Sequence, residues 1–592
     1  MIPSSSFKSF TEDLRSLIRH WRGITLRKLL YLPRILKSEE RRLLIFLFII
    51  AAISAAGIFG RVYVRLTSPI PAVGGSHVEG MLKEPRVINP VFASQDPERD
   101  LARLLFSGLV TYSSRGVAEP DLAERYEISN DGKIYTVTLR PELYWHDGER
   151  LDADDVIFTV RMIQNPIYKS PLRVNWQGVT AEKLDPRTAQ FTLRTPYAPF
   201  IENFTVGILP KHLWEQVDPV HALRHELNLK PVGSGPYVFD RLKQAKDGSL
   251  ISYQLTRNTR YHREGPYLKR MIFLFFKTEE ELLGAWRKGI VEALGTAPPS
   301  LHPELASHRS RLASLGMPRI FGLFFNEKKQ PFLASHKMRE AIARALNKET
   351  IIERVLSGGA APADLPLPWI SVKNSPDAAE ETLFAYNPDR SRELLEKEGW
   401  KDGDGDDIRE KRSRSKGKET VTPLRITLVT SDWPDLVRSG KEIKTMLKDI
   451  GMDVAVESRP FAELEASVIR PRNFELLLFG QVYGYEPDPF AFWHSSQIKD
   501  PGLNISFYAN KKADKILEDT RKTSDPAARD AGYLAFSDIL MKDLPAVFLF
   551  SQLYTYLLPE ALHGVDLARI SLPADRFNEA NRWYKTTDRV FR

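Results

Sequence analysis

Two carboxylates, Glu486 and Asp488, stand two positions apart in the segment GYEPDPF, where they could act as the acid and base of a hydrolase. Such pairs usually come from separate elements that face each other. Here they are flanked by Pro487 and Pro489 in a predicted turn. We therefore expect no catalytic residue in the chain, and an exported hydrolase that uses Glu486 and Asp488 is kept as an alternative.

A second chemically suggestive pair is His146 and Asp147 in the segment YWHDGE, which could bind a metal or transfer protons. No HExxH motif and no third ligand accompanies the pair, so we interpret it as a capped turn between a strand and a helix. The chain contains no cysteine. This excludes a disulfide, a thiolate metal site, a cysteine nucleophile and a lipid anchor on an acylated cysteine. We predict no metal site and no cofactor.

The acidic residues Asp402, Asp404 and Asp406 are spaced like calcium ligands in a charged segment, 401–420. An EF-hand loop would need a glycine at its sixth position and a glutamate at its twelfth, and this segment has neither. We expect a solvated hairpin tip, and calcium binding at 401–407 stays open as an alternative.

Strand and helix patterns alternate along the chain after residue 80, which predicts α/β lobes. Alternation of apolar and polar residues predicts strands at 134–139, 190–193, 252–256, 271–276, 424–429, 453–457 and 546–550. Apolar residues at helical spacing predict helices at 154–164, 337–345, 391–398, 440–450 and 514–520.

An uncharged run at residues 43–59 extends to 64 if Arg61 reaches outward, which is long enough for a transmembrane helix. The preceding tail, 1–42, carries ten Lys and Arg against four Asp and Glu, and so accounts for +6 of the formal charge of +8. Because the basicity is concentrated there, we predict no nucleic-acid partner. The positive-inside rule predicts that the tail is cytoplasmic and that the rest is exported.

Two alternatives stay open at this end of the chain. The apolar run could instead be a signal peptide that is cleaved near residues 52–57, where small residues gather. The tail itself could lie on anionic lipid as an interfacial helix, or form a disordered or partner-bound arm.

Eight further segments follow one another in the order found in a known family. They are Asn89-Pro90, LLFSGLVTY (104–112), the long stretch 123–159 that contains IYTVTLRPELYWHDGERLDADD, GILPKHLW (207–214), PVGSGPYVF (231–239), LTRNTRYH (255–262), 321–352 and YNPDRSRELLEKEGW (386–400). With GYEPDPFAFW (484–493), they resemble the family 5 extracellular solute-binding proteins, the oligopeptide- and dipeptide-binding components of ABC importers.

The resemblance implies an α/β fold of the type II periplasmic-binding-protein kind, with two lobes plus an extra domain, behind an N-terminal transmembrane helix. Two chain crossings, near Ile320 and Pro545, would form the hinge. The expected organisation is a basic cytoplasmic tail (1–42), an anchor (43–64), a linker (65–79), domain I (80–117, 231–320 and 546–592), domain II (118–230) and domain III (321–545).

One departure from the family pattern concerns the ligand. Peptide-binding members carry an Asp, seven residues before the position of Phe490, that pairs with the peptide ammonium, and this chain has Tyr483 there. A phenol is neutral at pH 7 and cannot supply that charge. A peptide-like solute is still expected, while a sugar or a metal chelate stays open.

The resemblance also implies ligand contacts and partners. The expected ligand-binding residues are Phe92, Ala93, Ser94, Trp176, Phe324, Gln481, Tyr483, Tyr485, Glu486 and Asp488. The expected partners are an oligopeptide or other small solute, an ABC permease in the cytoplasmic membrane, and the lipid bilayer around residues 43–64. The protein is expected to be a monomer and not an enzyme.

Overall fold

The structure is a computed structural model that describes residues 37–299, 310–367, 384–415, 418–523 and 525–591. The chain forms two compact units, and each is described by itself. One contains residues Met1–Pro71 and Thr587–Arg592, and the other contains Ala72–Thr586. Apart from residues 37–42, the basic tail predicted over 1–42 lies outside the described residues.

Within the described residues of the first unit lies one long helix, α4 (Ser38–Leu66), in which no residue is buried. Its 29 residues would extend about 44 Å, more than the ~30 Å hydrocarbon core of a bilayer. By length and composition α4 could cross a membrane, although a signal sequence would meet the same criterion. The apolar helix predicted over 43–64 is therefore confirmed, and its retention as an anchor stays a prediction.

Residues 65–79 do not form the linker that the sequence predicted. They complete α4, form strand β1 (Thr67–Ala72) and begin strand β2 (Gly74–Leu82). β1 pairs with strand β21 (Thr586–Phe591) in a two-stranded sheet. Such a ribbon has two outer edges, where Pro69 and Pro71 can be tolerated without the loss of a ladder hydrogen bond. The prolines therefore gave a misleading loop signal.

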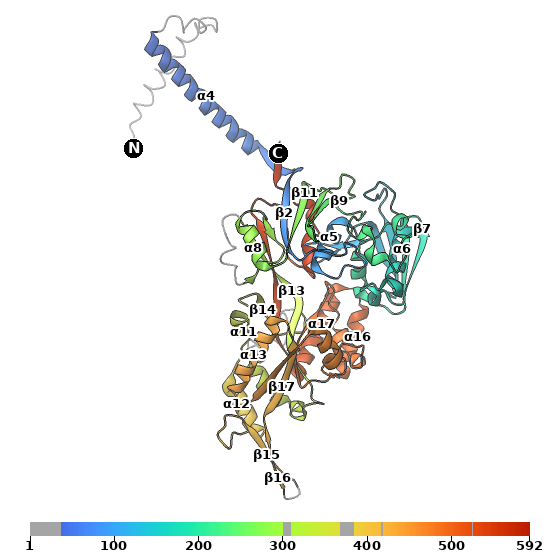
Figure 1. Cartoon of the computed structure of the whole chain (residues 1–592), viewed down its shortest axis with the longest axis vertical. Coiled ribbons are helices and arrows are strands. Elements are labelled where there is room, and N and C mark those ends of the chain that lie inside the picture. Colours follow the sequence, from blue (N-terminus) through green and yellow to red (C-terminus); the bar gives the residue numbers. More distant parts are fainter. Residues whose placement is uncertain (1–36, 300–309, 368–383, 416–417, 524, 592) are drawn as a thin grey trace, which may run out of the picture. The chain divides into compact units, whose positions relative to one another are not determined.

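The second unit is built on one long mixed sheet. Besides β2, its strands are β9 (Tyr237–Gln244), β10 (Leu250–Arg257), β11 (Leu268–Phe276), β12 (Ala293–Leu294), β13 (Ser310–Phe325), β14 (Ala360–Pro362), β17 (Arg425–Ser431), β18 (Asp453–Arg459), β19 (Leu476–Val482) and β20 (Ala546–Pro559). Their order is β18-β17-β19-β13-β20-β12-β2-β11-β10-β9, and β14 pairs with β20. Figure 1 shows β13 between the part of this sheet that contains β2 and the part that contains β17.

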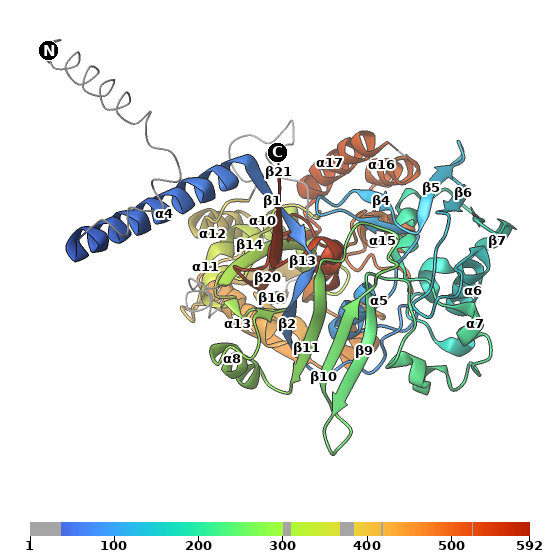
Figure 2. The same ribbon diagram turned by 90° about the horizontal axis from the view of Figure 1, so that it is seen from above.

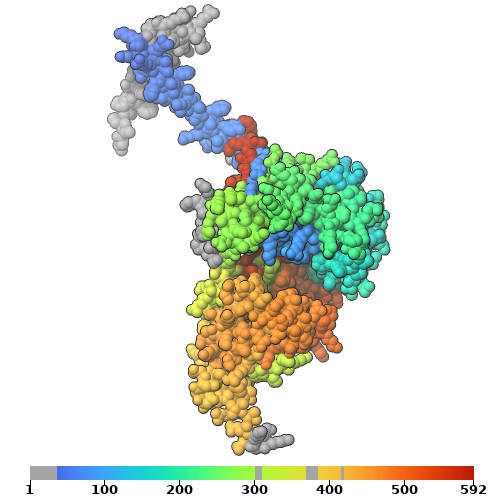
Figure 3. Space-filling model, in the orientation of Figure 1, coloured from blue at the N-terminus to red at the C-terminus, as the bar shows by residue number. Residues whose placement is uncertain are grey.

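Two lobes share this sheet, and each has hydrophobic cores of its own. Lobe A (72–316 and 553–586) is built around the cluster that contains Leu101, Val137 and Tyr556. Lobe B (320–551) is built around clusters that contain Leu428 and Phe536. Figure 3 shows the lobes as a green-to-blue and a yellow-to-orange surface that is indented where they meet.

The two long strands β13 and β20 join the lobes. They run antiparallel, and their register shifts between Gly316 and Ile320, so that Gly316 faces Leu553 and Ile320 faces Ser551. Pro318 within this shift has no N–H to donate to a ladder. The second crossing therefore lies later in the chain than the predicted Pro545, because the first residues of β20 pack in lobe B.

Lobe A also carries a smaller sheet in the order β5-β6-β8-β7, made of β5 (Ala123–Ile128), β6 (Ile134–Leu139), β7 (Val179–Asp185) and β8 (Thr188–Leu193). A hairpin, β3 (Val110–Tyr112) with β4 (Ala118–Pro120), precedes it. The helical segments of this lobe include α5 (Asp96–Leu105), α6 (Ala153–Gln164), α7 (Lys211–Trp214), α8 (Glu279–Arg287), η3 (Ala198–Thr205) and η11 (Pro573–Phe577). Figure 2 shows β9, β10 and β11 side by side, with α6 and α7 away to one side.

Lobe B places helices against the parallel strands β17, β18 and β19. Its helices are α10 (His336–Ala345), α11 (Lys348–Arg354), α12 (Pro388–Lys397), α13 (Pro434–Lys448), α14 (Phe461–Leu464), α15 (Phe490–Trp493), α16 (Lys511–Lys522) and α17 (Pro526–Asp543). α13 packs on β17 and β18 because Leu436, Ile443 and Leu447 form one buried stripe. A hairpin, β15 (Glu410–Ser415) with β16 (Lys418–Pro423), projects from this lobe.

The strands and helices predicted from the sequence all fall within elements of the expected type, with shifts at their ends. The predicted α/β architecture is therefore confirmed. The three predicted domains stay a prediction, since the residues assigned to domains I and II share one continuous core.

Candidate functional site

A cavity of about 510 Å³ lies between the two lobes. This volume falls in the range of ~300–1,000 Å³ that is typical of small-molecule sites. Lobe A lines it with residues from the β3–β4 hairpin, β5, β6 and η3, and lobe B with the segment after β19, with α16, and with α17. A solute in this cavity would contact both lobes at once.

Four tyrosines give the cavity walls that are apolar with polar edges. They are Tyr126, Tyr135, Tyr197 and Tyr485. The pleat of the small sheet explains the lobe A side, because Tyr126 and Ile128 alternate onto one face of β5. Tyr135 of β6 pairs directly with Ile128. Charged lining residues are Glu486, Lys522, Arg529, Asp530 and Arg569.

Tyr485 is held firmly where lobe B meets lobe A. Its ring stacks on Tyr112, with centroids 4.0 Å apart. The Arg569 guanidinium donates to the Tyr485 carbonyl oxygen at 2.6 Å and lies 5.9 Å from the centre of the same ring. Tyr112 is buried, and among the described residues its hydroxyl has no hydrogen-bond partner. The stack on Tyr112 and the contacts with Arg569 therefore fix the position of the Tyr485 ring in the cavity wall.

Glu202 of η3 connects the lobes directly. Its carboxylate accepts the backbone N–H of Tyr485 at 3.1 Å and also that of Glu486. Burial raises the pKa of Glu202 to about 7, although both N–H donors favour the charged form. Gly484 leaves room for this contact, since a Cβ there would lie 2.1 Å from the Glu202 Oε1 atom. The junction therefore depends on a buried carboxyl and on the absence of a side chain opposite it.

Two arginines of lobe B pair with the carboxylates first considered for catalysis. Arg529 of α17 contacts Glu486 at 2.7 Å, and Arg521 of α16 contacts Asp488 at 3.1 Å. The Arg521 guanidinium also lies 4.6 Å from the centre of the Tyr197 ring in lobe A. Burial raises the pKa of Asp488, and Arg521 opposes that shift. Both acids thus form ion pairs that hold the segment GYEPDPFAFW (484–493), here called the cleft segment, in place.

Of the ten predicted ligand contacts, Tyr485 and Glu486 line this cavity. The other eight are not among its described lining residues. Phe92 packs against Tyr168 and Trp214, and Ala93 is buried beside it. The Ser94 N–H donates to Glu98 at 2.9 Å where α5 begins, so Ser94 shapes a helix start.

Two other predicted contacts, Trp176 and Phe324, lie in cores. Trp176 packs against Phe191, Phe200 and Phe204, and borders a separate hollow of about 420 Å³ within lobe A. Phe324 stacks on Trp493.

Gln481 and Tyr483 are both buried, and the Tyr483 hydroxyl donates to the Gln481 Oε1 atom at 3.2 Å. Tyr483 packs with Leu367 and Tyr533, and burial raises the pKa of its hydroxyl above the usual range. A buried, neutral phenol at this place offers no charge for a peptide ammonium.

Several residues at the site escaped the sequence analysis, chiefly Tyr112, Tyr126, Glu202, Arg529 and Arg569. Tyr112 and Tyr126 lie inside two of the segments that carried the family resemblance, 104–112 and 123–159, so the resemblance could have identified them. Glu202 is separated from Tyr485 by 283 residues. No spacing along the chain could have paired them.

The remaining chemically suggestive residues have structural roles. The His146 Nδ1 atom accepts the Gly233 N–H at 3.1 Å, and its Nε2 atom donates to the Gly235 carbonyl oxygen at 3.1 Å. Burial lowers the pKa of His146 to about 4. Asp147 contacts His212 at 2.9 Å. The segment 401–420 does contain the expected hairpin. Asp402, Asp404 and Glu410 bring oxygens within 4.8 Å of one another at its base, so calcium there stays open.

The sequence model for "Bacterial extracellular solute-binding proteins, family 5 Middle" matches residues 117–501. The oligopeptide-binding protein AppA of Bacillus subtilis is 28% identical over 503 residues, which cover 83% of this chain and 89% of AppA. Its structure with a nonapeptide superimposes with a TM-score of 0.65, at 26% identity, over 87% of this chain and 99% of that one. NikZ of Campylobacter jejuni, solved with Ni(L-His), gives a TM-score of 0.65 at 26% identity, over 86% of this chain and 99% of NikZ.

Proposed function

Because the chain belongs to family 5 of the bacterial extracellular solute-binding proteins, we propose that it captures a peptide-like solute between its lobes for an ABC importer. The observation that carries this proposal is the cavity of about 510 Å³ whose walls come from both lobes. A solute there gains contacts with both walls only while the lobes are together. Its binding energy would therefore favour the closed arrangement.

The lining suits a solute with both apolar and polar groups. Tyrosine rings supply flat apolar area, and their hydroxyls can donate or accept. The lining carries the positive charges of Lys522, Arg529 and Arg569 beside the negative charges of Glu486 and Asp530, so it can accommodate a charged group on the solute. We place the ligand contacts at Tyr485 and Glu486 first. The other eight predicted residues would stabilise the structure that surrounds the cavity. They are Phe92, Ala93, Ser94, Trp176, Phe324, Gln481, Tyr483 and Asp488.

A non-peptide solute is the second candidate, and one observation favours it. Tyr483, at the position of the amine-pairing Asp, is buried and neutral. Glu486, which could substitute for that Asp, is already paired with Arg529. NikZ, at 26% identity, was solved with a nickel–histidine complex, so a metal chelate is a suitable probe beside peptides.

An exported hydrolase receives less support. The relatives are named as binding proteins, and both acids of the suggested pair are engaged by arginines. A general acid needs a proton to give and a clear path to the substrate. A guanidinium partner favours the charged form of a carboxylate, which has no proton to give, although burial raises the pKa of Asp488.

The rest of the proposal concerns location. We infer that α4 is retained as a single-pass anchor in the cytoplasmic membrane, with the basic tail inside and the residues after the anchor (43–64) outside. The protein would act as a monomer beside its permease. The basic charge before α4 supports this orientation.

Calorimetric titration of the full chain in detergent tests the binding proposal. The probes are a random-sequence nonapeptide pool and the nickel–histidine complex. We expect one probe to bind saturably and to be recovered unchanged. The variant Ala198→Trp, which fills the cavity, should abolish binding, whereas Ala455→Trp on the exposed face of β18 should not. Binding that survives Ala198→Trp would place the solute outside this cavity. Conversion of the probe to a product would support the hydrolase alternative.

A further inference from the structure

The end of α4 is fastened to strand β21, far along the chain. The Arg589 guanidinium of β21 donates to the carbonyl oxygens of Val64 at 2.9 Å and of Thr67 at 3.0 Å, and to the Thr67 hydroxyl at 2.8 Å. Carbonyls in the last turn of a helix lack intrahelical partners, and a cation there also favours the helix dipole. Arg589 therefore caps α4 across 522 residues of sequence.

Aromatic and apolar side chains continue from the helix onto the ribbon. The Phe591 ring lies 6.2 Å from the Tyr63 ring in an edge-on contact. Phe591 is 73% exposed and Val590 is 44% exposed, and Val64 and Leu66 at the end of α4 are exposed as well. A single apolar residue on a surface is ordinary, but this cluster continues the apolar surface of a helix that could span a membrane.

The length of the apolar run sets the depth of this cluster. The run begins at Leu43, directly after Arg41 and Arg42. A hydrocarbon core of ~30 Å takes about 20 helical residues, which brings the far boundary to Val62 or Tyr63. Because Phe591 contacts Tyr63, it lies at that same boundary. Arg65 and Arg589 then fall in the headgroup layer, and aromatic rings with nearby cations are typical of this layer.

We propose that the β1–β21 ribbon is a membrane-surface element, with Val590 and Phe591 inserted into the outer headgroup layer beside Tyr63. This rests on the proposed retention of α4 as an anchor. The partner is the lipid surface itself, and Arg65 and Arg589 favour anionic headgroups. β1 continues directly from α4 and is paired with β21, so the chain that follows the helix is a paired strand.

The absence of cysteine in the chain makes a direct depth measurement simple. A nitroxide is attached to Phe591→Cys in the full chain, which is reconstituted in phosphatidylcholine–phosphatidylglycerol vesicles. Leu47→Cys in the middle of α4 and Val421→Cys on the β16 hairpin serve as deep and aqueous references. Power saturation compares accessibility to oxygen, which enters lipid, with accessibility to a charged nickel chelate, which stays in water.

We expect the Phe591 label to give an oxygen-to-chelate ratio between those of the two references. Val590→Cys should give the same shift if the strand itself lies in the headgroup layer. A Phe591 label as aqueous as the Val421 label, with Leu47 deep, would overturn the ribbon proposal and leave the anchor intact. A Leu47 label that is as accessible to the chelate as the Val421 label would instead contradict the proposal that α4 is a membrane anchor. Shielding of Phe591 from both reagents would mean that protein covers the ribbon, which also contradicts the proposal.

Discussion

The carboxyl of Glu202 lies where the two lobes are in contact. It is held by backbone N–H groups of Tyr485 and Glu486, and its neighbours Asp575 and Glu486 add negative charge around it. With a pKa raised to about 7 by burial, the group changes protonation near neutral pH when the lobes are together. With the lobes apart, it should titrate as an ordinary glutamic acid.

This difference predicts that acid favours the joined lobes. Because the pKa of Glu202 is higher in the joined state, its contribution is fully present below about pH 4.5 and is lost as the pH rises through about 7. The whole effect amounts to at most about 3 kcal/mol. Electron–electron distance measurements between nitroxides at Ile251→Cys in lobe A and Val421→Cys in lobe B should show more of the joined state at pH 5 than at pH 8.

Two variants control for this interpretation. Glu202→Gln stays neutral at every pH and should remove the pH dependence while the lobes still join. Gly484→Ala places a Cβ against the carboxyl and should disfavour the joined state at both pH values. A pH dependence that persists in Glu202→Gln would assign the effect to another group.

A second prediction at the residue scale concerns Tyr485. Tyr485→Ala removes both a cavity wall and the stack on Tyr112. Loss of a buried aromatic contact costs about 1–3 kcal/mol, so binding of the active probe should weaken by about 5- to 150-fold in calorimetry. Tyr386→Ala, at an exposed tyrosine of lobe B, should bind as the parent does. Equal affinities for both variants would exclude Tyr485 as a ligand contact.

The sequence predicted the cleft segment better than it predicted the rest of the site. Tyr485 and Glu486 were found because the resemblance aligned the whole segment around GYEPDPF. Trp176 and Phe324 pack in cores and are not among the described lining residues of the cavity, and their ligand contact stays a prediction. An aromatic residue that packs in a core looks the same in a sequence as one that faces a ligand. Glu202 and Arg529 come near the segment only through the fold.

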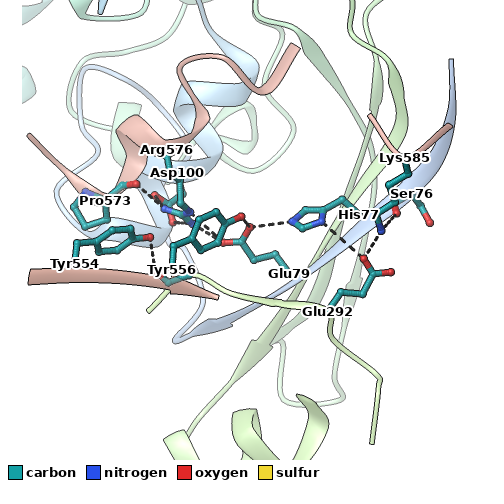
Figure 4. A network of polar contacts seen from close by, with 11 residues as sticks. Ser76, His77, Glu79, Asp100, Glu292, Tyr554, Tyr556, Pro573, Arg576 and Lys585 are labelled. Carbon is teal, nitrogen blue, oxygen red and sulfur yellow. Dashed lines mark hydrogen bonds and ion pairs between the residues drawn. The ribbon is translucent and has the colours of Figure 1, made fainter. Parts of the chain in front are cut away.

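At the scale of elements, a buried ion network joins the C-terminal part of lobe A to its sheet. Arg576 of η11 contacts Glu79 of β2 at 2.6 Å and Asp100 of α5 at 2.7 Å (Figure 4). His77 contacts Glu79 at 3.3 Å, and the Tyr556 hydroxyl donates to Glu79 at 2.8 Å. Burial would raise the pKa of Glu79, but Arg576 and His77 lower it overall to about 2.

Removal of the shared cation should therefore destabilise lobe A strongly. Arg576→Leu leaves two buried carboxylates without their partner, and breaking such a pair costs about 3–5 kcal/mol. Arg582→Leu is the matched control, because its half-exposed contact with Glu579 at 3.4 Å should be worth less than about 1 kcal/mol. Urea unfolding followed by tryptophan fluorescence compares the two. Similar midpoints for both variants would show that the network adds little stability.

Element types were predictable because hydrophobic periods of two and 3.6 residues are local properties of the chain. The ribbon β1–β21 was not, because prolines and glycines at 69–75 signal a loop and the partner strand lies at the opposite end of the sequence. The position of the register shift between β13 and β20, where the chain crosses between the lobes, was likewise not predicted. It depends on which core each half of β20 packs against.

For the molecule as a whole, the second unit consists of two lobes with separate cores that share two strands. The register shift between Gly316 and Ile320 interrupts the ladder where the chain passes from one core to the other. Few ladder bonds must change when the lobes rotate about this point, so the hinge can be soft while each lobe stays rigid. The cavity opens and closes with that rotation in the function proposed above.

Native mass spectrometry of the full chain, released from detergent after incubation with the active probe, tests the central claim most directly. The account predicts one bound solute per chain in the parent and in Ala455→Trp, and none in Ala198→Trp. Equal occupancy in all three proteins, or no bound solute in any of them, would contradict a solute site between the lobes.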